Sequence, residues 1–65
     1  MYYNENKAVS AARSLLRDDD LLVRVLVIFN RFASNYTLKP IFDVDAVLPR
    51  YSVHEIVERE EDIYA

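Results

Sequence analysis

The sequence predicts an all-α fold, a single small helical domain that spans residues 1–65. Apolar residues recur at spacings of three and four along residues 4–17, as on one face of a helix. A second apolar pattern runs through residues 20–35 without the turn residues that mark a β-hairpin on either side. The chain contains no glycine, so Asp, Asn, Ser and two prolines have to mark the ends of its elements. These three observations indicate two main helices, an irregular segment and a short C-terminal helix.

The first helix is predicted over residues 4–17. Asn4 or Asn6 is suited to its N-cap, because an asparagine side chain accepts hydrogen bonds from the first amides of a helix. Its apolar face consists of Ala8, Ala11, Ala12, Leu15 and Leu16. Three aspartates, residues 18–20, then favour a break and a new N-terminus. Metal binding by this triplet is the weaker interpretation, because adjacent carboxylates splay apart on a helix.

The second helix is predicted over residues 20–35. Arg24 and Arg31 fall on one narrow polar stripe, and the apolar residues occupy about 240° of the circumference, far more than a helix packed on one side needs. We therefore expect a second copy of the chain, or another protein, to cover the surplus. The valines of residues 21–29 also favour strands, so a strand is the alternative for this run.

The rest of the chain is less regular. Pro40 biases Lys39 towards an extended conformation and ends the second helix before it. Residues 41–47 suit a short strand, but a lone strand needs a partner. Unless a dimer supplies the pairing, we therefore expect a single helical turn over residues 44–48 that Asp43 caps and Pro49 ends. Ser52 and Glu55 have the spacing of a capping box, which predicts a C-terminal helix over residues 52–63.

Composition excludes most recognisable catalytic chemistry. Without glycine there is no dinucleotide fingerprint or P-loop, and without cysteine there is no disulfide, thiolate zinc site or cysteine nucleophile. His54 and Glu58 lie one helical turn apart, but no second histidine completes a metal site. We expect a chain with no cofactor and no metal, and not an enzyme.

Charge and hydropathy limit the partners. The net charge is −3, and residues 43–65 hold seven acidic against two basic residues. This pattern lacks the dense basic footprint of a nucleic-acid binder. Arg24 interrupts the longest apolar run, which is too short to span a membrane, and the N-terminus has no signal-peptide pattern. We expect a cytoplasmic protein with no membrane or nucleic-acid partner.

The leading functional hypothesis is a non-enzymatic protein–protein interaction module that acts stoichiometrically as a modulator or inhibitor of a larger protein. We expect it to form a homodimer. In size and economy the chain resembles accessory proteins of bacteriophages and mobile elements. The alternatives are a small dimeric DNA-binding regulator and a structural subunit of a larger assembly. The predicted interaction residues are Val23, Arg24, Val27, Arg31, Phe32 and Tyr36.

Overall fold

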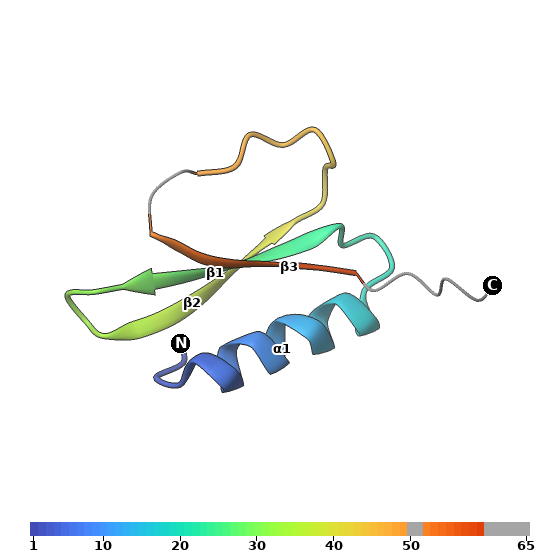
Figure 1. Ribbon diagram of the computed structural model, residues 1–65. Coiled ribbons are helices and arrows are strands. Elements are labelled where there is room, and N and C mark those ends of the chain that lie inside the picture. The colour runs from blue at the N-terminus through green and yellow to red at the C-terminus, as the bar shows by residue number, and fades with distance from the viewer. Residues whose placement is uncertain (50–51, 60–65) are drawn as a thin grey trace.

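The structure is a computed structural model that describes residues 1–49 and 52–59. Along this part of the chain, a helix is followed by three strands: α1 (Glu5–Asp18), β1 (Arg24–Asn30), β2 (Asn35–Ile41) and β3 (Val53–Glu58). The strands form an antiparallel sheet in the order β2–β1–β3, so β1 is the central strand. Figure 1 shows α1 lying along one side of this sheet.

The predicted all-α fold is wrong. The helix predicted over residues 4–17 is confirmed as α1, but the helix predicted over residues 20–35 is instead β1, a turn and the start of β2. The helix predicted over residues 52–63 is replaced by β3, which ends at Glu58, and residues 60–63 of that prediction lie outside the described residues. Ser52 has a positive φ of 62° and therefore does not act as the N-cap of a helix.

α1 begins where the sequence indicated. Asn4 is its N-cap, and the Asn4 side chain accepts a hydrogen bond from the backbone amide of Lys7. Ala8, Ala12 and Leu16, four residues apart, form its buried face. The small alanines allow a close approach, but the partner is the sheet and not a second helix. α1 ends at Asp18, and the Asp19 carboxylate accepts from the amide of Leu21 in the turn that leads to β1.

β1 is buried on both of its faces, which explains why its sequence resembled that of a helix with neighbours all round. Val25 and Val27 belong to the core cluster that includes α1. Leu26 alternates with them and points to the opposite face, yet it is fully buried as well. A strand covered on both sides has a continuous apolar run, and periodicity alone does not separate such a run from a buried helix.

β2 is an edge strand, and its composition fits that position. Pro40 pairs with Val25 and has no amide to donate, which is tolerated at the edge of a sheet. On the outer side of β2, Tyr2 and Tyr36 exchange two backbone hydrogen bonds, of 2.8 and 2.6 Å. The start of the chain therefore protects part of this edge.

The connection from β2 to β3 is irregular over its described part, residues 42–49. Asp43 starts a turn: its carboxylate accepts from the amide of Asp45, and its carbonyl accepts from the amide of Ala46. Beyond the end of β2, neither the alternative strand over residues 41–47 nor the expected helical turn over residues 44–48 forms. In Figure 1 the connection arches over the side of the sheet that α1 leaves uncovered.

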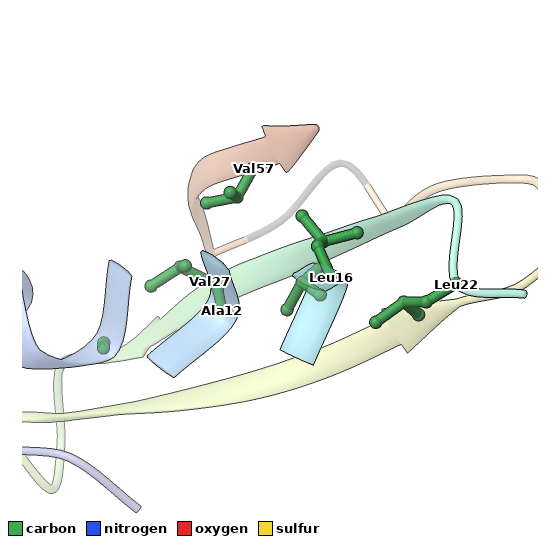
Figure 2. Packing of buried hydrophobic residues seen from close by; sticks show 7 residues of the cluster. Ala12, Leu16, Leu22, Val27 and Val57 are labelled. Carbon is green, nitrogen blue, oxygen red and sulfur yellow. The ribbon is translucent and has the colours of Figure 1, made fainter. Parts of the chain in front are cut away.

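The main core lies between α1 and the sheet. Figure 2 shows Ala12 and Leu16 of α1 close to Val27 of β1 and Val57 of β3, with Leu22 beside them. All of these side chains are buried. Over the part of the chain that the structure describes, no helix has the length and apolar character needed to cross a membrane.

Candidate protein-binding surface

The hairpin between β1 and β2 turns without glycine. Asn30 and Asn35 are paired across its base, and four residues join them. The Asn30 side chain accepts hydrogen bonds from the amides of Phe32 and Ala33, at 3.0 and 3.2 Å. Ser34 adopts a φ of 53°, the left-handed conformation that glycine or asparagine usually supplies. Asparagine hydrogen bonding thus replaces the usual turn chemistry.

The tip of this hairpin presents a large aromatic side chain to solvent. Phe32 is 89% exposed, although burial of a phenylalanine normally contributes roughly 1.5–3 kcal/mol to folding. The Arg31 guanidinium lies 5.3 Å from the centre of the Phe32 ring, within the range of a cation–π contact. An exposed aromatic beside an arginine has the composition of an interface anchor.

An open groove of about 760 Å³ adjoins the tip. Its lining comes from the end of β1, the turn, the first half of β2 and the start of β3. The lining residues are Ile28, Phe29, Asn30, Arg31, Phe32, Thr37, Ser52, Val53 and His54. We call these residues the tip surface. It contains an arginine and a histidine but no acidic residue.

Aromatic contacts support the base of the tip surface. The rings of Phe29 and Tyr36 lie 4.9 Å apart, and the ring of Tyr36 meets that of His54 at 5.3 Å and 70°. Nε2 of His54 lies 2.9 Å from a carboxylate oxygen of Glu5 at the start of α1. The register of β3 against β1 shifts between Val27 and Ile28, opposite His54. These contacts tie the helix, β2 and β3 together beneath the groove.

The structure separates the six predicted interaction residues into three places. Arg31 and Phe32 form the tip, and Tyr36 supports its base. Val23 and Arg24 lie at the other end of β1, where the Val23 amide donates to the carbonyl of Ile41 and the Arg24 guanidinium lies 3.8 Å from the Glu58 carboxylate.

Val27, the sixth predicted residue, is fully buried against α1 and offers no surface. The sequence argument for an interface depended on an incompletely covered helix. Residues 24–30 are instead a strand whose centre, Val25–Val27, is buried on both faces, so this run offers no surplus helix face to a partner. A binding surface has to be inferred from the residues that the fold leaves exposed.

Sequence reasoning missed the seven residues that complete the tip surface, which are Ile28, Phe29, Asn30, Thr37, Ser52, Val53 and His54. Their proximity depends on strand pairing, since Thr37 and Val53 both lie opposite Ile28 in the register of the sheet. His54 had been paired with Glu58 on a helix, whereas in the structure its partner is Glu5. Among residues 1–49 and 52–59, no group of three His, Cys, Asp or Glu side chains is placed to hold a metal ion.

Comparison with known proteins gives no match: no family model, no curated protein and no solved structure is similar to this chain.

Proposed function

We propose that the chain is a non-enzymatic binding module that acts stoichiometrically on a larger protein through the tip surface. The observation that carries this proposal is the exposure of Phe32, 89%, at the end of a turn held by side-chain hydrogen bonds. The turn and the aromatic base are ordered by contacts within the chain, so presenting Phe32 to a partner requires little further ordering.

Charge complementarity indicates the kind of segment that fits. The tip surface offers Arg31, His54 and apolar groups, and it lacks a carboxylate. A twofold contact between two copies would place both Arg31 side chains in one interface with no acidic residue of that surface to neutralise them. An apolar segment with an acidic residue, supplied by a different protein, satisfies both requirements. We therefore assign the tip surface to a larger partner.

The test compares two phenylalanines that are both exposed. Phe32→Ala removes the aromatic group of the tip, whereas Phe42→Ala removes one that is 56% exposed on the β2–β3 connection. A partner captured from the source organism is purified, and its binding to the three forms of the chain is measured by calorimetry. We expect one-to-one binding that falls at least tenfold with Phe32→Ala, about 1.4 kcal/mol, and changes little with Phe42→Ala.

Further measurements on the same variants test the other functional hypotheses. If sedimentation equilibrium shows a dimer that Phe32→Ala dissociates, the tip surface binds a second copy and the proposal is wrong. Assembly beyond a dimer that needs Phe32 would instead indicate a structural subunit. Salt-sensitive binding of duplex DNA that needs Arg31 would indicate the nucleic-acid regulator.

A further inference from the structure

Three arginines line a second hollow, at the opposite end of the sheet from the tip surface. The hollow has a volume of about 540 Å³ and lies between the C-terminal half of α1 and the end of β3. Its lining residues are Arg13, Leu16, Arg17, Glu58 and Arg59. Arg13 and Arg17 are one helical turn apart, so their side chains emerge on the same side of α1. We call this hollow the arginine cleft.

Arg59 is held in place by the backbone. Its Nη2 donates one hydrogen bond to the carbonyl of Asp19, at 2.7 Å, and one to the carbonyl of Leu22, at 2.8 Å. A guanidinium carries five N–H groups, so Nε and Nη1 of Arg59 retain three for another acceptor. These two bonds fix the position of the guanidinium and reduce the entropy that binding a ligand would cost.

The charge of the cleft is not balanced by its own acidic residue. Among residues 1–49 and 52–59, the three arginines and Glu58 that line the cleft give a local charge of +2, in a chain whose net charge is −3. Glu58 is also drawn towards Arg24, whose guanidinium lies 3.8 Å from its carboxylate. Across residues 1–49 and 52–59, no carboxylate forms a salt bridge with Arg13 or Arg17.

We propose that the arginine cleft binds a phosphate monoester dianion. Guanidinium groups bind phosphate oxygens through paired, charge-assisted hydrogen bonds, and a dianion neutralises a site of charge +2. The buried side chain of Leu16 forms the apolar part of the cleft lining. Nucleic acid fits less well, because its binding depends on many phosphate contacts along a basic surface, and the chain as a whole is acidic. This inference is independent of the tip surface.

The test is a titration of the nitrogen-15-labelled chain with inorganic phosphate at low ionic strength, followed by NMR. We expect saturable shifts at residues 13–17 and 58–59. Arg13→Gln and Arg17→Gln should each weaken binding about tenfold, the effect of losing a charged hydrogen bond in an open site. Lys39→Gln, which removes the same charge from β2, is the matched control and should leave the affinity within about twofold.

Glu58→Gln gives a result in the opposite direction. It removes the acidic residue of the cleft, so phosphate should bind several-fold more tightly. A phosphoserine peptide and a sugar phosphate then distinguish the sources of the group: whichever binds more tightly than inorganic phosphate identifies a protein or a metabolite ligand. Arg59 is left unchanged because it also supports the α1–β1 turn.

Three results would overturn the proposal. The first is the absence of a saturable shift with inorganic phosphate. The second is an affinity that Arg13→Gln and Arg17→Gln leave unchanged, which would locate binding elsewhere. The third is duplex DNA that binds through the same arginines more tightly than any phosphate monoester, which would assign the cleft to nucleic acid.

Discussion

The two faces of β1 carry similar apolar residues, but a helix packs on only one of them. On one face Val25 and Val27 pack against a regular helix whose contacting residues are all buried. On the other face Leu26 is equally inaccessible, but its neighbour Ile56 is 44% exposed. Figure 1 shows the irregular connection on that side of the sheet, and the connection exposes Phe42, Val44 and Val47. Leu26 is thus fully buried on the face that carries no helix.

The largest effect is expected on the helix side of β1. Val27→Asp places a carboxylate in a fully buried position with no cationic partner in the cluster. The cost should exceed about 4 kcal/mol, a large part of the roughly 5–15 kcal/mol that stabilises a small domain. We expect loss of the folded far-ultraviolet circular dichroism signal. If the Val27→Asp variant stays folded but has a lower mass in solution than the unmodified chain, Val27 lies instead in an interface between two copies.

Leu26→Ala tests whether the face of β1 opposite α1 contributes apolar packing to stability. Leu26 is fully buried, so its truncation should cost about 2–5 kcal/mol in urea denaturation. Val47→Ala, at a position 97% exposed on the same connection, is the control and should change stability by less than about 0.5 kcal/mol. Equal, small effects at both positions would mean that the face opposite α1 is open to water.

The smallest effects concern two polar contacts of β3. His54 of β3 contacts Glu5 of α1, and Glu58 of β3 contacts Arg24 of β1. Both carboxylate side chains are more than half exposed, at 51% and 66%, so solvent screens them strongly. Glu5→Gln and Glu58→Gln should each cost less than about 1 kcal/mol in the same urea assay. A larger loss from either variant would show that charge, and not apolar packing, holds β3 in the sheet.

Local chemistry was sufficient to predict α1 from the sequence. Asn4, its N-cap, was one of the two residues predicted for that role, and Ala8, Ala12 and Leu16 belong to the predicted apolar face. Leu15, which was predicted on the same face, is 42% exposed. A break at residues 18–20 was also predicted, but the new helix expected there was not formed. Asp19 caps a turn into a strand instead.

The sheet depended on information that a single segment does not contain. Val25, Leu26 and Val27 match a fully buried strand and a buried helix equally well until the neighbours on both sides are known. The hairpin was hidden because Asn30 and a serine in the left-handed conformation replace the glycine that usually marks such a turn. In the candidate site, Arg31 and Phe32 were predicted. The groove beside them was not, because strand register brings Thr37 and Val53 to Ile28.

β3 lies beside β1 and not beside β2, and this strand order determines the path of the connection between β2 and β3. To reach the far side of the central strand, the chain leaving β2 must cross one face of the sheet, and α1 already occupies the other. A simple meander of the same three strands would need no such crossing. The neighbour order of the strands thus gives a short polypeptide a third layer without a further helix or strand.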